Sequence, residues 1–367
     1  MRLKGLYILD GDAYDLVYGP DERAAIGRLV DVYAPRQTRH SILENPKLLE
    51  PAEVIFSGWG APALTDGFLD AAPNLKAFFY GGGALGTVLS PAVWERGVVV
   101  TSAIVANSIP VAEYTLATIL FSLKQGWQLA RQTRERRAFP DRNVAPGCYG
   151  STVGLISLGV IARTLLKLLT AYDLKVLAYD PFLTPAEADE LGVERVELAE
   201  LFRRSDVVSL HTPLLPETSG LITGELLAQM KSGATFINTA RGEIVVEPEM
   251  LAVAAARRDL QFVLDVTDPE PPAADSPLYT LPNIVLTPHI AGSVGSECRR
   301  MGRYMVQELE RFVSGRPLQW AVSRDDAQNT SHQPVSDNHH KNNKQSTFVR
   351  SAAFAAVPGV RISVQEI

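Results

Sequence analysis

Short apolar runs alternate with stretches of helical periodicity along the first hundred residues. Between the apolar runs, residues 21–30 and 65–72 place apolar side chains at helical spacing. Strands that alternate with helices are typical of a parallel sheet, so we expect an α/β fold here. The runs rich in β-branched and aromatic residues predict five strands, at residues 5–12, 30–35, 53–60, 75–83 and 98–103.

A mostly apolar helix is predicted over residues 107–132. Asn107 and Ser108 precede Pro110, which is the pattern of a helix start, and we expect the helix to begin there and to be well buried. The following residues 138–150 are rich in proline, glycine and asparagine and predict a loop.

A second and longer α/β series begins at Ser151. Its apolar runs are separated by helical segments, and six such strands fit the two-halved doubly wound fold. One long helix, residues 293–315, follows the series. The six predicted strands are residues 152–157, 175–180, 206–213, 234–241, 261–266 and 283–289.

The chain changes character from about Asp325. Residues 328–347 are polar and poor in apolar side chains, so we expect disorder. His339 and His340 in this segment are a weak signal for metal binding. Residues 348–367 are apolar enough to pack against another part of the protein.

Composition narrows the class of protein. The 367 residues suggest about two domains, and 46% hydrophobic with 21% charged residues is ordinary for a globular protein. The net charge of −6 argues against a nucleic-acid partner, which would need a basic surface. The one basic cluster, residues 131–137, contains a glutamate at helical spacing and is interpreted as a solvated helix face.

Cysteine usage and hydropathy predict a cytoplasmic protein. Cys148 and Cys298 lie far apart and outside any ligand motif, so neither a disulfide framework nor a metal site follows. The apolar run at the N-terminus is too short for a signal peptide. No apolar stretch approaches the roughly 20 residues of a membrane helix, so we expect no membrane partner.

The segment GSTVGLISLGVIAR, residues 150–163, departs from the dinucleotide-binding fingerprint G-x-G-x-x-G/A. Gly159 keeps the position where the backbone approaches a pyrophosphate, and Ala162 is an accepted third residue. Ser157 replaces the first glycine, and we expect it to fit only with a negative φ. The cofactor contacts predicted for this turn are Ser157, Leu158, Gly159, Val160 and Ile161.

Asp180 ends the next predicted strand, 21 residues after Gly159. A spacing of about 20 fits the acid that binds the adenosine ribose hydroxyls. An acid favours NAD, because the 2′-phosphate of NADP would meet a carboxylate. The alternative is an aspartate that caps the loop before Pro181, and the spacing favours the ribose interpretation.

Polar or small residues end all six strands of the second series. Ligands of an open parallel sheet bind beyond the carboxyl ends of its strands. Any one of these residues could simply meet water, but six together predict a binding site. The further residues predicted at this edge are His211, Thr212, Pro213, Thr239, Ala240, Arg241, Asp265, Glu270 and His289.

Six segments resemble, in sequence and order, the D-isomer-specific 2-hydroxyacid dehydrogenases. The similarity covers roughly residues 50–320 and is strongest over 107–293, where NTARG, D-V-x-x-x-E-P and PHIAG are highly specific as a set. The segments are NSIPVAEYTLATILFSLK, GSTVGLISLGVIAR, HTPLLPETSGLI, FINTARGEIV, LDVTDPEPP and LTPHIAGS.

The resemblance implies two Rossmann-like α/β domains with doubly wound parallel sheets. Residues 1–105 with 293–323 would form a flavodoxin-like substrate-binding domain that is split in sequence. Residues 106–292 would form the NAD-binding Rossmann domain, and residues 324–367 a disordered tail. Such proteins are usually homodimers joined through the cofactor domain.

The resemblance also assigns roles to matching residues. Arg241 would bind the carboxylate and carbonyl oxygen of the substrate, and His289 would be the general acid or base. Glu270 would hold the imidazole and favour its protonated form. The residues implied to contact NAD are Asp180, Thr239, Ala240, Asp265, His289 and Gly292.

The chemistry of 2-keto acid reduction supports these roles independently. The reaction needs a hydride at carbon and a proton at oxygen, and histidine suits proton transfer near neutral pH. The planar fork of arginine suits a carboxylate beside a carbonyl. A lone histidine before an apolar segment is more often structural, but Arg241 and Glu270 on nearby strand ends favour catalysis by His289.

The first domain offers a substrate-binding loop. Gly81, Gly82 and Gly83 follow a strand and could present N–H groups to the substrate carboxylate, the alternative being a flexible turn. Trp59 and Tyr80 predict an aromatic wall beside it. The loop lacks the aspartate often seen after these glycines in the family. No cluster of arginine or lysine is evident there, which argues against phosphoglycerate as the substrate.

The leading hypothesis is an NAD-dependent dehydrogenase of a small 2-hydroxy acid. The alternative is a non-catalytic, NAD-responsive interaction protein of the corepressor kind, which the intact Arg241, Glu270 and His289 disfavour. Formate oxidation on the same scaffold ranks lower, because that subgroup pairs its histidine with an amide side chain and Glu270 is an acid.

Overall fold

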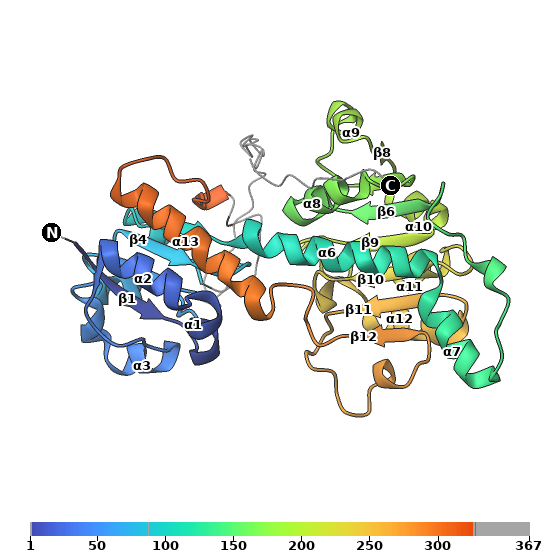
Figure 1. The fold of residues 1–367 in the computed structure, drawn as a ribbon, viewed down its shortest axis with the longest axis horizontal. Helices are drawn as coiled ribbons and strands as arrows, with labels where there is room; N and C mark the ends of the chain where they lie inside the picture. Colours follow the sequence, from blue (N-terminus) through green and yellow to red (C-terminus); the bar gives the residue numbers. More distant parts are fainter. Residues whose placement is uncertain (1, 87, 326, 328–367) are drawn as a thin grey trace, which may run out of the picture. The chain divides into compact units, whose positions relative to one another are not determined.

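The computed structural model describes residues 2–86, 88–325 and 327. The predictions of a disordered tail, of metal binding by His339 and His340, and of packing by residues 348–367 lie outside the described residues. Within them, the elements form two parallel α/β sheets, each with its own helices, as Figure 1 shows.

The N-terminal sheet has five parallel strands in the order β2-β1-β3-β4-β5, which is the flavodoxin-like order. All five predicted strands are confirmed, whereas α1, α3 and α5 were not expected from the sequence. The strands are β1 (Leu3–Ile8), β2 (Val30–Val32), β3 (Val54–Ser57), β4 (Ala77–Tyr80) and β5 (Val99–Ser102). The helices are α1 (Gly11–Val17), α2 (Pro20–Leu29), α3 (Arg39–Glu44), α4 (Asp66–Ala71) and α5 (Ala92–Glu95).

Successive side chains of these strands point to opposite faces of the sheet, so each face has its own core. Phe78 packs in one core with Ile42 of α3 and Phe68 of α4. Its neighbour Phe79 packs in the other, with Ile26 of α2 and residues of the C-terminal helix. Each strand therefore needs apolar side chains at every position, because both of its faces are buried.

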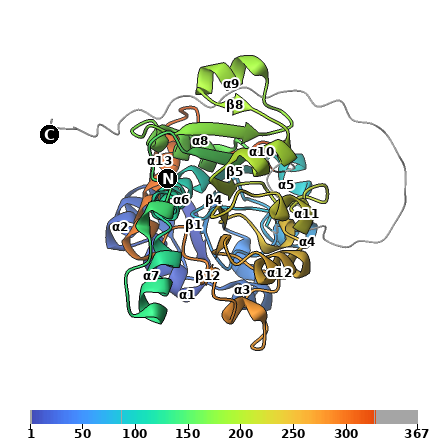
Figure 2. The ribbon, with the colours of Figure 1, turned by 90° about the vertical axis from the view of Figure 1, so that its right-hand side faces the viewer.

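The second sheet has seven parallel strands in the order β12-β11-β10-β9-β6-β7-β8. The six predicted strands are confirmed, and the two-residue β8, at the edge opposite β12 (Figure 2), was missed. The strand order reverses between β6 and β9, which makes their carboxyl ends the expected ligand-binding crevice. The strands are β6 (Thr152–Ile156), β7 (Lys175–Tyr179), β8 (Glu194–Arg195), β9 (Val207–Leu210), β10 (Thr235–Asn238), β11 (Gln261–Leu264) and β12 (Ile284–Leu286).

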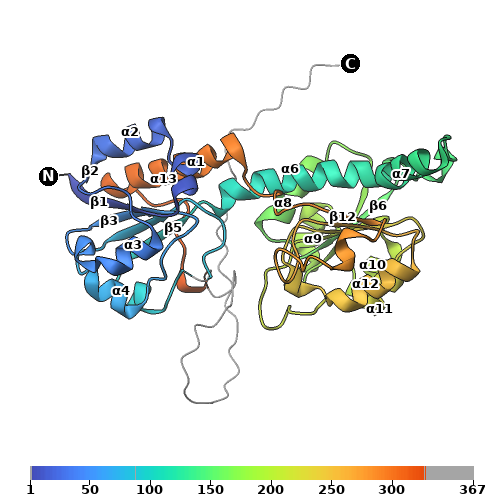
Figure 3. The ribbon, with the colours of Figure 1, turned by 90° about the horizontal axis from the view of Figure 1, so that it is seen from below.

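Helices cover both faces of the second sheet (Figure 3). Residues of α6 and α8 form one core, and residues of α10, α11 and α12 form the other. The helices of this lobe are α6 (Ile104–Leu123), α7 (Gly126–Arg136), α8 (Val160–Leu169), α9 (Pro185–Leu191), α10 (Leu198–Arg204), α11 (Gly224–Ala228) and α12 (Glu247–Ala256).

The prediction that the long helix begins near Pro110 is wrong, because α6 begins at Ile104 and contains the proline. Asn107 does not cap the helix. Its Oδ1 accepts a hydrogen bond from the backbone N–H of Ser293 at 2.9 Å. A left-handed residue, Gln125 at φ +48°, then separates α6 from α7.

α6 is also longer and more apolar than expected. It has 20 residues and a mean hydropathy of 1.4, which by length and composition alone is enough to cross a membrane, so the prediction that no apolar stretch approaches this length is wrong. Ala112, Ile119 and Leu123 of this helix are fully or almost fully buried in the core that β6 and α8 share. These three side chains therefore belong to the interior of this lobe, whereas Phe121 of the same helix is 46% exposed.

The C-terminal helix α13 (Cys298–Val313) packs against α1 and α2. The backbones approach closely at Gly302, where an added Cβ would lie 2.0 Å from the carbonyl oxygen of Val17. Only glycine permits this approach, because the obstacle is backbone and cannot rotate away.

Gly302→Ala is expected to lower the free energy of unfolding by about 1–3 kcal/mol, the usual effect of overpacking. Gly27→Ala in α2 is the matched control, because an added Cβ there meets nothing within 4 Å. The control should be neutral or stabilising by roughly 0.5–1 kcal/mol. Urea unfolding of both variants measures the difference, and equal stabilities would contradict the packing argument.

Candidate active site

The turn after β6 holds Ser157 at φ +69°, so the prediction of a negative φ is wrong. This conformation costs a non-glycine residue about 1–2 kcal/mol. Two contacts with neighbouring strand ends hold it. The Ser157 N–H donates to the carbonyl oxygen of Tyr179 at 2.8 Å, and its Oγ lies 2.9 Å from Oγ1 of Thr212.

The start of α8 fits the pyrophosphate of a dinucleotide. Gly159 is the N-cap residue, and an added Cβ there would meet nothing within 4 Å. The space beside this backbone is therefore open. The unbonded N–H groups at the start of a helix favour an anion.

Asp180 lies directly against this turn. Its Oδ2 accepts a hydrogen bond from the N–H of Leu158, and its Oδ1 accepts one from the N–H of Phe182, both at 2.8 Å. The carboxylate thus caps its own loop and also borders the cofactor turn. The two sequence interpretations of Asp180 are compatible, and ribose binding stays a prediction.

His211 follows directly after β9 and is a buried, neutral imidazole. Its side chain is 8% exposed, and burial lowers its pKa from 6.5 to about 4. Nε2 lies 3.0 Å from Oγ of Ser209, and Nδ1 has no hydrogen-bond partner among the described residues. His211 therefore supports the sheet edge without carrying a charge at neutral pH.

The turn after β10 is shaped by the side chain of Asn238. Its Oδ1 accepts from the N–H of Ala240, and its Nδ2 donates to the carbonyl oxygen of Arg241, both at 2.9 Å. Arg241 donates from Nη1 to the oxygen of Ala240 at 2.6 Å and forms no ion pair with an acid among the described residues. Its positive charge is therefore available to a ligand.

Gly242 brings this turn against the loop that follows β11. A Cβ at Gly242 would lie 2.1 Å from the carbonyl carbon of Thr267. This close approach explains the glycine of the NTARG segment. It also brings the backbone after Arg241 to the start of the loop that carries Glu270.

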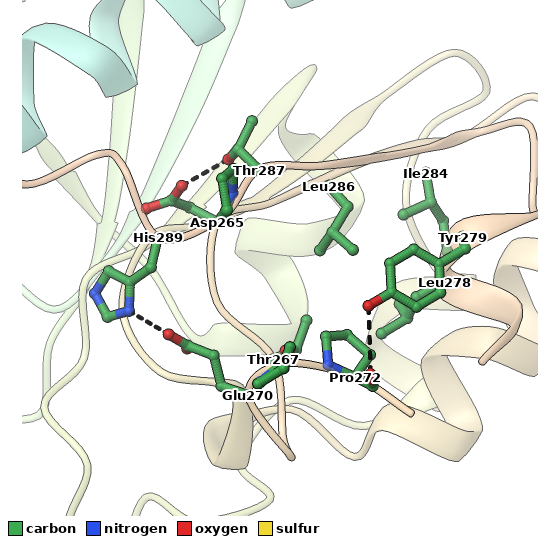
Figure 4. A pocket seen from close by; sticks show the side chains of 12 residues that line it. Asp265, Thr267, Glu270, Pro272, Leu278, Tyr279, Ile284, Leu286, Thr287 and His289 are labelled. Atoms are coloured by element: carbon green, nitrogen blue, oxygen red, sulfur yellow. Dashed lines mark hydrogen bonds and ion pairs between the residues drawn. The ribbon is translucent and has the colours of Figure 1, made fainter. Parts of the chain in front are cut away.

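His289 and Glu270 form a hydrogen-bonded pair, with 2.7 Å between Nδ1 and Oε1 (Figure 4). Both side chains are about half exposed, at 46% and 45%. Glu270 engages Nδ1, so Nε2 is the ring nitrogen left for a ligand. His289 has φ +53°, the second strained non-glycine residue at this sheet edge.

A cavity of about 600 Å³ opens beside this pair. Figure 4 shows Glu270, Thr267 and His289 at one end of it and apolar side chains at the other. The apolar end is formed by Pro272, Leu278, Tyr279, Ile284 and Leu286, and Pro271 also lines the cavity.

The glycine loop of the N-terminal lobe is closely packed. An added Cβ at Gly81 would lie 2.7 Å from Val17, and one at Gly82 would lie 2.7 Å from the ring of Tyr80. None of the three glycines has a left-handed φ, so close packing explains the first two. Trp59 nearby is 38% exposed, and Tyr80 is buried. Their roles toward a substrate stay predictions.

Sequence reasoning missed three polar residues beside the site. Asn107 was interpreted only as a helix start, yet it binds the loop after His289. Thr287 and Tyr114 are hydrogen-bonded to each other at 2.9 Å. The sequence offered a signal for two of these residues: Thr287 places a hydroxyl two residues before His289, and Tyr114 places a tyrosine in a mostly apolar helix.

Residues 116–291 match the family model described as D-isomer specific 2-hydroxyacid dehydrogenase, NAD binding domain. The D-3-phosphoglycerate dehydrogenase of Archaeoglobus fulgidus is 33% identical over 255 residues, which is 70% of this chain and 48% of that protein. The (S)-sulfolactate dehydrogenase of Chromohalobacter salexigens is 38% identical over 250 residues, 66% of this chain and 79% of that protein. The chain thus spans about half the length of the phosphoglycerate dehydrogenase.

The fold has known counterparts. The NAD-complexed D-isomer specific 2-hydroxyacid dehydrogenase of Lactobacillus delbrueckii superposes with a TM-score of 0.70 at 22% identity, covering 87% of this chain and all of that one. The two sheets and their strand orders agree with this Rossmann-like architecture. The chain therefore belongs to the D-isomer-specific 2-hydroxyacid dehydrogenase family, with an NAD-binding domain over residues 116–291.

Proposed function

We propose that the protein is an NAD-dependent oxidoreductase that interconverts a 2-keto acid and a D-2-hydroxy acid. The observation that carries the proposal is the pair of His289 and Glu270 at 2.7 Å, in a chain of this family that also keeps Arg241 free of an acid partner within the described residues. NAD would accept or supply the hydride. The turn at Ser157 to Ile161, Asp180 and Thr212 would hold it.

His289 moves the proton in this proposal. During reduction its imidazolium donates to the carbonyl oxygen of the keto acid, and during oxidation the neutral ring accepts the hydroxyl proton. Glu270 accepts the hydrogen bond of Nδ1, which fixes the orientation and the tautomer of the ring. Nε2 is therefore the atom that exchanges the proton with the substrate.

Arg241 binds the substrate acid. A guanidinium can donate two parallel hydrogen bonds to a carboxylate, or to a carboxylate oxygen and the adjacent carbonyl oxygen. Its own hydrogen bond to the oxygen of Ala240 leaves further N–H groups for this purpose. The positive charge of Arg241 also stabilises the negative charge that develops on the carbonyl oxygen before this oxygen is protonated.

We propose a small 2-hydroxy acid as the substrate. The names of the relatives above denote hydroxy acids with a phosphate or sulfonate as a second acidic group. Arg39 donates from Nε to the carbonyl oxygen of Ala61, which is two residues after Trp59 in the chain. A cation therefore lies at the loop that carries Trp59. Acids with a second anionic group therefore belong in the substrate panel.

We infer that the protein is a cytoplasmic homodimer. In this proposal residues 106–292 bind NAD and join the two copies, while residues 1–105 and 293–323 bind the substrate. The support for a dimer is that α6 and the segment after α7 expose four large apolar side chains, which a partner surface would bury. They are Phe121 at 46%, Phe139 at 94%, Val144 at 54% and Tyr149 at 86% exposure.

His289→Gln is expected to lower kcat/KM by about 10²–10⁴-fold, the usual contribution of a general acid or base. The Kd for NADH should change much less than kcat/KM, because the other predicted cofactor contacts are kept. Initial rates of NADH oxidation with glyoxylate, hydroxypyruvate, pyruvate and an aromatic keto acid measure the effect. His40→Gln is the control, because that exposed histidine pairs only with Glu44 among the described residues. Binding of NADH without turnover of any keto acid or of the acids with a second anionic group would favour the interaction-protein alternative.

Asp180 is expected to select NADH over NADPH. The wild type should show kcat/KM at least about tenfold higher with NADH, which corresponds to 1.4 kcal/mol of discrimination. Asp180→Asn removes the negative charge while keeping the side-chain size, and it should narrow the ratio. Parallel kinetics with both cofactors provide the measurement. A wild-type preference for NADPH would contradict the ribose assignment.

A further inference from the structure

A chain of three hydrogen-bonded side chains leads from α6 to the loop that carries His289. The hydroxyl of Tyr114 lies 2.9 Å from Oγ1 of Thr287, which donates to Oδ1 of Asp265 at 2.6 Å. Asp265 is 2% exposed, at the end of β11. The three residues come from α6, the end of β12 and the end of β11, and they meet beside the catalytic loop.

The direction of these hydrogen bonds follows from the groups involved. A threonine hydroxyl has one proton, and a carboxylate can only accept. Thr287 gives its proton to Asp265, so it must accept from Tyr114. Burial raises the pKa of Tyr114, which keeps its hydroxyl protonated and able to donate. The chain therefore runs one way, from Tyr114 through Thr287 to Asp265.

Asp265 connects these side chains to three consecutive residues of the loop, His289, Ile290 and Ala291. Its Oδ1 also accepts from the N–H of Ile290 at 2.9 Å, and its Oδ2 accepts from the N–H of Ala291 at 2.8 Å. Its backbone oxygen accepts from the N–H of His289 at 3.0 Å. The left-handed conformation of His289 persists only if its surroundings over-determine it, and these bonds do so.

We propose that Tyr114 and Thr287 are positioning residues, which act through Asp265 to hold the His289 loop in its strained conformation and the imidazole against Glu270. The inference rests on the proposed function of His289. Without the Thr287 hydroxyl, Oδ1 of Asp265 keeps only the N–H of Ile290, and a buried carboxylate loses a donor. Tyr114 connects the hydrogen-bonded side chains to α6, and support from a rigid helix keeps reacting groups in place.

The test compares Thr287→Val, which removes the donor at nearly constant shape, with Thr287→Ser, which retains it. The valine variant should lower kcat by at least about tenfold with little change in the KM for the keto acid, because misplaced groups cost rate rather than binding. The serine variant should retain kcat within about twofold. Tyr114→Phe should lower kcat less than Thr287→Val, since Thr287 still donates to Asp265.

Thr115→Val is the matched control. Thr115 is a fully buried threonine of α6, but its hydroxyl donates to the oxygen of Val111 and does not reach Asp265. The same chemical change should leave kcat within about twofold of the wild type. An equal loss of kcat in Thr115→Val and Thr287→Val would overturn the proposal, because general loosening of the core would then explain both.

Amide hydrogen exchange provides a readout that needs no activity. Thr287→Val and Tyr114→Phe should speed the exchange of the Ile290 and Ala291 amides, whereas Thr287→Ser and Thr115→Val should not. Faster exchange in a protein without measurable turnover would contradict the proposed function and support the positioning role. Unchanged exchange and kcat in Thr287→Val, or an equal loss in Thr287→Ser, would overturn the inference. If Thr287→Val fails to fold, Tyr114→Phe carries the same test.

Discussion

The candidate site depends on the register of β10, β11 and β12, because the last residues of these strands pair with one another. Asn238 pairs with Leu264, and Leu264 pairs with Leu286, so the three parallel strands end together. The residues that follow must emerge at one sheet edge. Arg241 and His289, far apart in the chain, therefore both follow strands that end at this edge, and Gly242 is needed where the loops after β10 and β11 touch.

Backbone strain is concentrated at the same edge. Ser157 and His289 are left-handed non-glycine residues that follow β6 and β12, and such conformations cost of order 1–3 kcal/mol each. Each is held by bonds from neighbouring strand ends: Ser157 by Tyr179 and Thr212, His289 by Asp265. The sheet edge thus supports the hydrogen-bonded pair of His289 and Glu270, whose side chains stay about half exposed.

Much of the fold could be predicted, because a strand buried on both faces is a local apolar run. The errors arose where a residue had a distant partner. Asn107 is a residue type that often caps helices, but its side-chain oxygen accepts a hydrogen bond from the N–H of Ser293. The helix begins at Ile104 instead. Ser157 was expected at a negative φ from its own preference, which the contacts with Tyr179 and Thr212 override.

The amino-acid sequence by itself determined where the main strands lie, their parallel arrangement, and the residue types that end them, because periodicity and strand ends are local properties. It also carried the motifs of the family. Tertiary structure alone decided the geometry of the contacts: the 2.7 Å between Glu270 and His289, a pair that the family resemblance only implies, and the connection from Tyr114 to Asp265 through Thr287. Such contacts join distant segments, and their geometry exists only once the sheet has been assembled.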